Sequence, residues 1–332
     1  MTQTILLGAR LPGAPHRIIE DRYRILLPDG DIMPQDELDE HLQEADAVVA
    51  LLSQKVGAAQ FERAPNLKVV SNYAVGYDNI DVDEATRRGI VVTNTPDVLT
   101  ETTADLAWSL MMAAARRIVE SDRFVREKRF TGWQPSLMLG LDLFGKTLGI
   151  VGFGRIGRAM ARRAAGFDMT VLYAARSSAH DDAAADGEPR LVANRDPRLV
   201  SLDSLLRESD FVSLHCPLTP ATRHLIGAEQ LRLMKDSAVL VNTARGPVID
   251  ETALIDALEN HAIAAAGLDV YEQEPLVPDR LLALDNVVFA PHIGSASHDT
   301  RRAMARMAVD AAEQVLSGRT PDHPVNPSAL KK

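Results

Sequence analysis

The sequence has 332 residues, 46% of them hydrophobic and 25% charged, and a formal net charge of −10. Its length predicts about two domains, and its acidic balance disfavours nucleic acid and anionic membrane surfaces as partners. The single cysteine, Cys216, excludes an internal disulfide and a cysteine-rich zinc site, and we predict no metal. The N-terminal residues lack a signal-peptide pattern and no apolar run reaches about 18 residues, so we expect a cytoplasmic globular protein outside the membrane.

Residues 1–99 alternate short apolar runs with amphipathic segments. The expected strands are Thr4–Leu7, Tyr23–Leu27, Ala47–Leu52, Leu67–Ser71 and Ile90–Thr93, and the expected helices are Pro15–Asp21, Gln35–Glu44, Ala58–Ala64 and Val82–Arg88. Such alternation predicts a parallel sheet that helices cover on both faces. No internal repeat is apparent in the sequence.

A long apolar helix is expected from Thr100, its N-cap, to Arg126. The segment that follows is too irregular for a regular element and too apolar for a free loop, with Trp133 and Phe144 in need of cover. We interpret it as an arm that joins two copies in a homodimer, the alternative being a loop folded on its own domain.

Residues 147–167 combine a buried strand, a glycine turn and a helix. Gly152, Gly154 and Gly157 form the G-x-G-x-x-G pattern directly after the strand. In this context the three glycines permit a tight turn, a close approach of backbone to pyrophosphate, and close packing of helix on strand. The helix N-terminus would present unpaired N–H groups to the phosphates. The sequence therefore predicts a dinucleotide site.

The end of the next expected strand, Thr170–Tyr173, bears on the choice of dinucleotide. An NAD site usually places Asp or Glu there to bind the ribose, but this chain has Ala175, followed by Arg176 and Ser177. An arginine with a neighbouring hydroxyl suits a 2′-phosphate, which favours NADP(H) over NAD(H). Acidic residues in the segment 179–199 leave NAD(H) open.

Four further strands are expected, and polar side chains follow them. The strands are Phe211–His215, Ala238–Val241, Ala264–Leu268 and Val287–Ala290, with helices expected at Glu229–Lys235 and Thr252–His261. Ligands of parallel sheets bind outside the carboxyl ends of the strands. The residues expected there are Thr243, Ala244, Arg245, Asp269 and His292, with Glu274 shortly after Asp269. A last helix, capped by Ser297 and ended by Gly318, is expected to return to the first domain and leave a cleft.

Three of these residues suggest a reaction. Arg245 can grip a carboxylate, and His292 can give a proton to a carbonyl oxygen as hydride arrives. Glu274 could orient the imidazole and favour its charged form. A 2-oxo acid fits this trio, although each residue alone could equally be a surface, turn or packed loop residue.

Several blocks of the sequence resemble the D-isomer-specific 2-hydroxyacid dehydrogenase family. They cover nearly the whole chain in order: NYAVGYDNID, VTNTPDVLT, GFGRIGRAMA, HCPLT, LMKDSAVLVNTARGPVID, AAAGLDVYEQEP and APHIGSAS. Within the family, the chain is most similar to the glyoxylate/hydroxypyruvate reductases.

The resemblance implies an α/β protein with two Rossmann-like or flavodoxin-like doubly wound domains and a cleft between them. Residues 1–99 and 294–332 would form the substrate domain, and residues 100–293 the NAD(P)-binding domain. The chain would be a homodimer that reduces small 2-oxo acids (glyoxylate, hydroxypyruvate) to 2-hydroxy acids, with Arg245 binding the substrate and Glu274 supporting the acid/base His292. Val75 and Gly76 would bind the substrate carboxylate.

The residues expected around the cofactor follow from the same motifs. They are Thr103, Gly152, Gly154, Arg155, Ile156, Gly157, Arg176, Ser177, Cys216, Pro217, Thr243, Ala244, Asp269, His292 and Gly294. Leu137 stands where eukaryotic hydroxypyruvate reductases commonly have an aromatic residue, so the preferred substrate size stays open. The alternatives are a 2-ketogluconate reductase, a 3-phosphoglycerate dehydrogenase and, more distantly, a non-enzymatic dinucleotide sensor similar to the C-terminal-binding corepressors.

Overall fold

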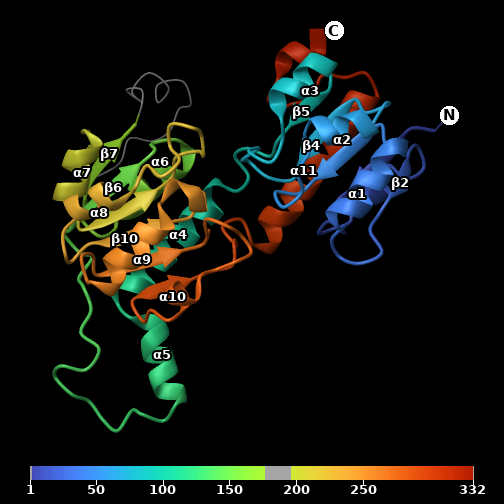
Figure 1. Ribbon diagram of the computed structural model, residues 1–332. Helices are drawn as coiled ribbons and strands as arrows, with labels where there is room; N and C mark the ends of the chain where they lie inside the picture. Colours follow the sequence, from blue (N-terminus) through green and yellow to red (C-terminus); the bar gives the residue numbers. More distant parts are fainter. Residues whose placement is uncertain (1, 176–195, 332) are drawn as a thin grey trace. The chain divides into compact units, whose positions relative to one another are not determined.

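The computed structural model describes residues 2–175 and 196–331. The chain divides into two compact units: unit 1 comprises Met1–Leu99 and Ser295–Lys332, and unit 2 comprises Thr100–Gly294. Each unit is a parallel sheet covered by helices (Figure 1), as the alternating sequence pattern predicts.

The sheet of unit 1 has five parallel strands in the order β2-β1-β3-β4-β5. They are β1 (Thr4–Leu7), β2 (Arg24–Leu26), β3 (Ala47–Ala50), β4 (Val69–Asn72) and β5 (Val91–Thr93). The residues of β1, β3, β4 and β5 are all buried, which explains why these strands read as continuous apolar runs rather than as alternating ones. The five predicted strands are thus confirmed, with small changes at their ends.

Helices cover both faces of this sheet. On one face, α1 (Gln35–His41), α2 (Ala58–Arg63) and α3 (Val82–Arg88) contribute Leu38, Phe61 and Ala85 to a shared core. On the other face lies α11 (His298–Leu316), whose Ala308 carbonyl accepts a 2.7 Å hydrogen bond from the Ser71 hydroxyl of β4. The expected helix Pro15–Asp21 is only the short 3₁₀ turn η1 (Pro15–Ile18). Two further 3₁₀ turns belong to unit 1: η2 (Leu42–Glu44) follows α1, and η4 (Pro327–Lys331) lies near the C-terminus.

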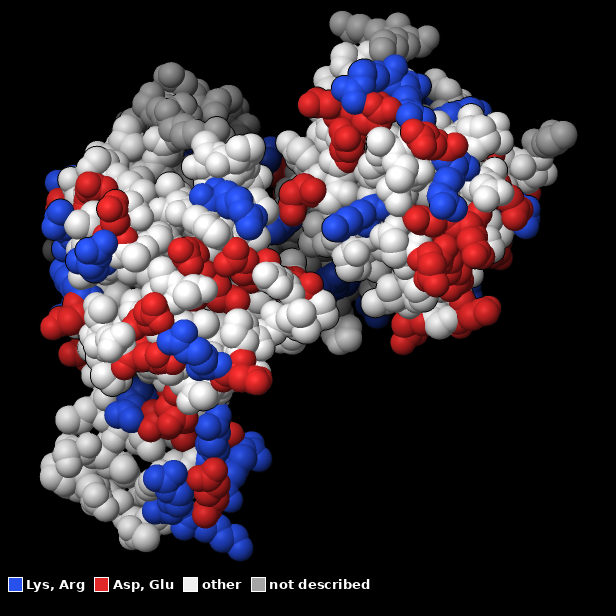
Figure 2. Space-filling view, viewed as in Figure 1, with Lys and Arg blue, Asp and Glu red and all other residues white. Residues whose placement is uncertain are grey.

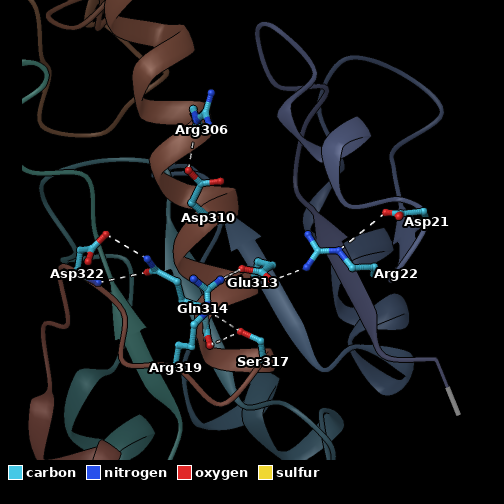
Figure 3. A network of polar contacts seen from close by, with 9 residues as sticks. All are labelled: Asp21, Arg22, Arg306, Asp310, Glu313, Gln314, Ser317, Arg319 and Asp322. Carbon is cyan, nitrogen blue, oxygen red and sulfur yellow. Dashed lines mark hydrogen bonds and ion pairs between the residues drawn. The ribbon is translucent and has the colours of Figure 1, made fainter.

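A buried carboxylate fixes the C-terminal part of α11 (Figure 3). Glu313 is buried and accepts from Arg22 at 2.8 Å and from Arg319, which lies just after the helix. Gln314 donates to Asp322 at 3.1 Å. These contacts tie the segments before β2 and after α11 to the helix.

The sheet of unit 2 has seven parallel strands in the order β12-β11-β10-β9-β6-β7-β8. They are β6 (Thr147–Val151), β7 (Thr170–Ala174), β8 (Arg198–Leu199), β9 (Phe211–Leu214), β10 (Val239–Asn242), β11 (Ala265–Leu268) and β12 (Val287–Phe289). The strand order reverses between β6 and β9, so the crevice outside their carboxyl ends is the expected nucleotide position.

Helices again cover both faces of the sheet. On one face, α4 (Thr100–Ala115) and α6 (Arg155–Ala165) share a core that contains Met111 and Met160. On the other face, α7 (Leu202–Glu208), α8 (Ala228–Leu233), α9 (Glu251–Glu259) and α10 (Asp279–Leu282) pack around Leu206, Leu231 and Leu254. Three elements, β8, α7 and α10, were not predicted from the sequence.

The single helix expected from Thr100 to Arg126 is wrong. Arg117 adopts the left-handed conformation (φ 52°) and separates α4 from α5 (Ile118–Arg126). The helices differ in environment, because α4 is largely buried whereas α5 has no buried residue. Thr100 is the first helical residue rather than the N-cap.

An arm formed by α5 and residues 127–146 extends from the rest of unit 2 (Figure 1). Two of its aromatic side chains face solvent, Trp133 at 84% and Phe144 at 68% exposure, whereas Leu143 at its end is buried in the core of unit 2. Figure 2 shows uncharged surface on the arm beside the basic side chains of α5. Such exposure is unusual for large apolar residues.

The two units contain a short repeat, contrary to the expectation that the sequence has none. Residues 56–76 and 226–246 align without a gap, and the identical pairs are Gly57 and Gly227, Ala58 and Ala228, Gln60 and Gln230, Val69 and Val239, Asn72 and Asn242, Ala74 and Ala244, and Gly76 and Gly246. In both segments a glutamine side chain accepts from the glycine N–H at the start of the helix, at 3.1 and 3.2 Å. Both segments then enter an interior strand, β4 or β10, that ends in a buried asparagine.

Candidate active site

Unit 2 gathers most of the predicted residues at one edge of its sheet. Because its strands are parallel, the residues that follow β6, β9, β10, β11 and β12 all lie at the carboxyl edge. These residues include Gly152, Cys216, Arg245, Asp269 and His292. The expectation that strand ends would meet at one edge is therefore confirmed.

The glycine turn after β6 has the conformation that the motif requires. Gly152 has a φ of 92°, and a Cβ there would lie 2.7 Å from the backbone nitrogen of Cys216. A Cβ on Gly157 would lie 2.3 Å from the carbonyl oxygen of Gly152, so α6 packs against the turn only because residue 157 is glycine. At Gly154 a Cβ would meet no atom within 4 Å, which leaves the start of α6 open to a ligand.

The loop after β10 holds a buried hydroxyl without a protein partner. Thr243 is buried, and its Oγ1 makes no hydrogen bond within the part of the chain that the structure describes. An unmet buried polar atom costs about 1–3 kcal/mol, so a ligand that bonds to this hydroxyl would be favoured. Together with the open start of α6, Thr243 makes this edge suitable for a dinucleotide.

The other expected cofactor residues differ in accessibility. Arg155 and Pro217 are exposed, while Ile156 and Ala244 are half-buried. Arg176 and Ser177, on which the preference for NADP(H) depends, lie outside the described residues.

Asp269 organises the loop that carries His292. Its carboxylate accepts from the backbone N–H groups of Ile293 (2.7 Å) and Gly294 (2.8 Å), and its carbonyl accepts from His292 N (2.8 Å). Burial raises the pKa of Asp269. Thr103 lies beside it, since a Cβ on Gly294 would be 3.3 Å from Asp269 Oδ2 and 3.4 Å from Thr103 Cγ2. Gly294 therefore belongs to unit 2, not to the returning segment where the sequence analysis placed it.

His292 and Glu274 form a direct pair. His292 Nδ1 lies 2.7 Å from Glu274 Oε2, and Glu274 Oε1 accepts from the backbone N–H of Tyr271 at 3.1 Å. Burial acts to raise the pKa of Glu274, but the hydrogen bond and charge of His292, the Tyr271 N–H and the charge of Arg245 outweigh it and lower that pKa. An ionised Glu274 thus holds Nδ1 and leaves Nε2 of His292 for proton exchange. His292 itself has a left-handed backbone (φ 54°), as residues held for function often have.

Arg245 is held in the loop after β10 by backbone contacts. Asn242 Nδ2 donates to the Arg245 carbonyl at 2.9 Å, and Arg245 Nη1 donates to the Ala244 carbonyl at 2.7 Å. Its charge lowers the pKa of Glu274, so the structure brings Arg245, Glu274 and His292 into one electrostatic group.

Three residues that shape this group were missed in the sequence. Asn242 holds the Arg245 loop, and Gly246 allows it to touch the next loop, because a Cβ there would lie 1.8 Å from the Tyr271 carbonyl oxygen. The Tyr271 hydroxyl donates to the Ala290 carbonyl at 2.9 Å, and burial raises its pKa to about 12, so it remains a donor. A polar residue directly at the end of a buried strand was the available signal for Asn242.

Fold and site together define a dinucleotide-dependent oxidoreductase. Residues 108–294 match the family described as D-isomer specific 2-hydroxyacid dehydrogenase, NAD binding domain. The chain is 52% identical to a glyoxylate reductase of Korarchaeum cryptofilum, with 100% of this chain and 98% of that protein covered. The chain belongs to the D-isomer-specific 2-hydroxyacid dehydrogenase family.

Solved structures agree with this assignment. The TT0316 protein of Thermus thermophilus is similar with a TM-score of 0.88 and 43% identity, covering 97% of this chain and 100% of that one. An NADPH-dependent glyoxylate/hydroxypyruvate reductase of Sinorhizobium meliloti, solved with NADP and malonate, is similar with a TM-score of 0.85 and 32% identity. The match covers 99% of this chain and 98% of that one. The chain is therefore an enzyme that uses a nicotinamide dinucleotide and acts on 2-oxo acids. Among the described residues, no helix is long and apolar enough to span a membrane.

Proposed function

We propose that this enzyme reduces glyoxylate and hydroxypyruvate, with Arg245, His292 and Glu274 as its catalytic residues. The observation that carries the proposal is the 2.7 Å contact between His292 and an ionised Glu274 in the field of Arg245. The names of the relatives from Korarchaeum cryptofilum and Sinorhizobium meliloti support the choice of substrates.

Each residue has one role in this reaction. Bound reduced nicotinamide supplies a hydride to the carbonyl carbon of the 2-oxo acid. Arg245 binds the acid and polarises its carbonyl group, while His292 Nε2 gives the carbonyl oxygen its proton. Glu274 stabilises the charged imidazole before that transfer. One hydride and one proton thus convert the carbonyl group to a secondary or primary alcohol.

Substitution of the catalytic residues tests this assignment. We expect Arg245→Ala and His292→Ala each to lower kcat/KM for glyoxylate by roughly 10²–10⁴-fold while dinucleotide affinity stays near wild type. His224→Ala is the matched control, because the His224 imidazole also contacts a glutamate at 2.7 Å, but that glutamate is Glu272 and not Glu274. Near-normal turnover in either active-site variant would contradict the proposal.

We assign unit 1 as the substrate domain and unit 2 as the NAD(P)-binding domain. The match of residues 108–294 supports the second assignment. For the first, the support is the loop after β4, where Val75 and Gly76 would bind the substrate carboxylate through backbone N–H groups. Assays with 2-ketogluconate and 3-phosphohydroxypyruvate beside glyoxylate and hydroxypyruvate separate the two alternative enzyme activities.

NADP(H) is proposed as the preferred cofactor. The support is the sequence after β7, where Ala175 and Arg176 replace the acidic residue of an NAD site. The Sinorhizobium meliloti relative is described as NADPH-dependent. Initial rates with NADPH and NADH test this choice, and Arg176→Ala should lower the NADPH preference by roughly tenfold if Arg176 binds the 2′-phosphate.

The arm of α5 and residues 127–146 is proposed to pack on a second copy of this chain. Its exposed Trp133 and Phe144 would be removed from water in a homodimer. A cytoplasmic location is also proposed. Cys216 is the single cysteine of the sequence and is buried, so the chain cannot form an internal disulfide, which agrees with a reducing compartment.

A further inference from the structure

In the loop after β4, the carbonyl groups of the four residues 74–77 all accept hydrogen bonds from the protein. The Ala74 carbonyl accepts from Thr95 N (2.9 Å), and the Tyr77 carbonyl accepts from Ile80 N (3.0 Å). Between them, side-chain amides supply the donors: Asn94 Nδ2 bonds to the Val75 carbonyl at 2.8 Å, and Asn72 Nδ2 bonds to the Gly76 carbonyl at 2.6 Å.

The N–H groups of the same loop are left available. In the described chain, the backbone N–H groups of Val75, Gly76 and Tyr77 donate no hydrogen bond. In a trans peptide the N–H points opposite to the carbonyl group. Holding the carbonyls of Val75 and Gly76 inward therefore aims the N–H groups of Gly76 and Tyr77 outward. Successive N–H groups of this kind bind anions.

Asn72 is itself held by a second amide. Its side chain makes a reciprocal pair with Asn79, at 3.2 Å in both directions. Asn79 Nδ2 also donates to the carbonyls of Leu51 and Gln54, both at 3.0 Å, in the loop after β3. Asn72 is completely buried, so its amide has no freedom to turn away from Gly76.

The repeat between the units supplies an independent observation. Asn242 occupies the position of Asn72 in the second copy of the repeat, and Arg245 occupies that of Val75. Asn242 Nδ2 donates to the Arg245 carbonyl at 2.9 Å, and its Oδ1 accepts from Ala244 N at 3.0 Å. The same residue type thus holds the backbone of both loops to which the substrate is assigned.

We propose that Asn72, aided by Asn94, and Asn242 are equivalent positioning residues for the 2-oxo acid. Asn72 and Asn94 orient the peptide groups that receive the substrate carboxylate, and Asn242 fixes the backbone of Arg245. This inference rests on the proposed function.

Replacement of each asparagine by alanine tests the inference. In Asn72→Ala and Asn94→Ala we expect KM for glyoxylate to rise roughly tenfold to a hundredfold, with kcat and KM for NADPH within about twofold of wild type. In Asn242→Ala we expect kcat to fall as well, because Arg245 also polarises the reacting carbonyl group. Asn326→Ala is the matched control: Asn326 is a buried asparagine of unit 1 that bonds to Thr86 and Ile90, so it should lower the melting temperature and leave KM unchanged.

Calorimetric binding of oxalate to the cofactor-loaded protein separates this inference from the proposed function. Oxalate has the carboxylate group of the substrate and binds without turnover, so its Kd measures carboxylate binding alone. This Kd should rise in Asn72→Ala and Asn94→Ala in parallel with KM for glyoxylate. Unchanged oxalate affinity in both variants, or an equal rise in Asn326→Ala, would overturn the positioning role. Failure of the wild type to reduce any 2-oxo acid would instead contradict the proposed function.

Discussion

At the scale of single residues, the pair of His292 and Glu274 is the proposed source of the proton for reduction. The pKa of Glu274 is lowered in the folded protein, so its carboxylate stays charged across the neutral range. This carboxylate lies 2.7 Å from Nδ1 of His292 and fixes the orientation of the imidazole ring.

Replacing Glu274 by glutamine removes that charge and keeps the size of the side chain. We expect kcat/KM for glyoxylate to fall by roughly tenfold to a hundredfold, because the neutral amide holds Nδ1 of His292 less firmly than the carboxylate does. Initial rates at saturating NADPH measure this loss. Glu272→Gln is the control, since Glu272 contacts His224 rather than His292, and an unchanged kcat/KM in Glu274→Gln would count against the pairing.

At the scale of elements, an aspartate joins the starts of the two strands at the switch point in each unit. In unit 1, Asp46 accepts from Thr4 N at 2.9 Å, and in unit 2, Asp210 accepts from Thr147 N at 2.9 Å. Asp210 also contacts Lys235 Nζ at 2.7 Å. Burial acts to raise the pKa of Asp210, but these two contacts outweigh it and lower the pKa.

The lowered pKa of Asp210 predicts a pH-dependent contribution to stability. Because the folded pKa lies below the unfolded one, the contribution is complete above about pH 4 and is lost as the pH falls through the folded value. Asp210→Asn should therefore cost about 1–2 kcal/mol of unfolding free energy at pH 7, and the difference should narrow below about pH 4. Urea titrations at several pH values measure it, with the exposed Asp285→Asn as control. If the loss of unfolding free energy in Asp210→Asn were the same at every pH, the role of the charge would be refuted.

The buried Glu313 of α11 leads to a second prediction at this scale. Glu313→Ala removes the shared acceptor of Arg22 and Arg319 (Figure 3), and the two guanidinium groups can then turn to water. We expect the free energy of unfolding to fall by about 1–2 kcal/mol, as measured by thermal unfolding. Asp310→Ala, which removes an exposed pair with Arg306 on the same helix, should change stability by less than about 0.5 kcal/mol. Equal losses in both variants would argue against a special role for Glu313.

At the scale of the whole molecule, the arm predicts the state of assembly. Trp133→Asp combined with Phe144→Asp places charges on the apolar surface of the arm, so the proposed dimer should dissociate. Sedimentation equilibrium should give a dimer for the wild type and a monomer for the variant. Leu276→Asp is the control, because Leu276 is 69% exposed in unit 2 but lies outside the arm. A monomeric wild type, or a variant that remains dimeric, would refute the proposal.

Local sequence was sufficient for most of the fold. Buried parallel strands are continuous apolar runs, so β1, β3, β9 and β11 could be found from composition alone. The glycine turn was equally readable, because Gly152 and Gly157 stand where no other residue fits. Helix ends were harder to predict: nothing in residues 100–126 marks the left-handed Arg117, which separates the largely buried α4 from the exposed α5.

Tertiary structure decided how the catalytic candidates meet. From the sequence, Arg245, Glu274 and His292 are separate residues at separate strand ends, and only the folded sheet brings their charges together. The sequence also conceals the asparagines, because Asn72 acts on Gly76 and Asn242 acts on Arg245 through backbone carbonyls whose direction depends on the folded loop. Apolar periodicity and glycine sterics are properties of neighbouring residues, which is why the sequence by itself determined the elements and the family. Hydrogen-bond partners and pKa shifts depend on distances between remote segments, so only the tertiary structure could decide them.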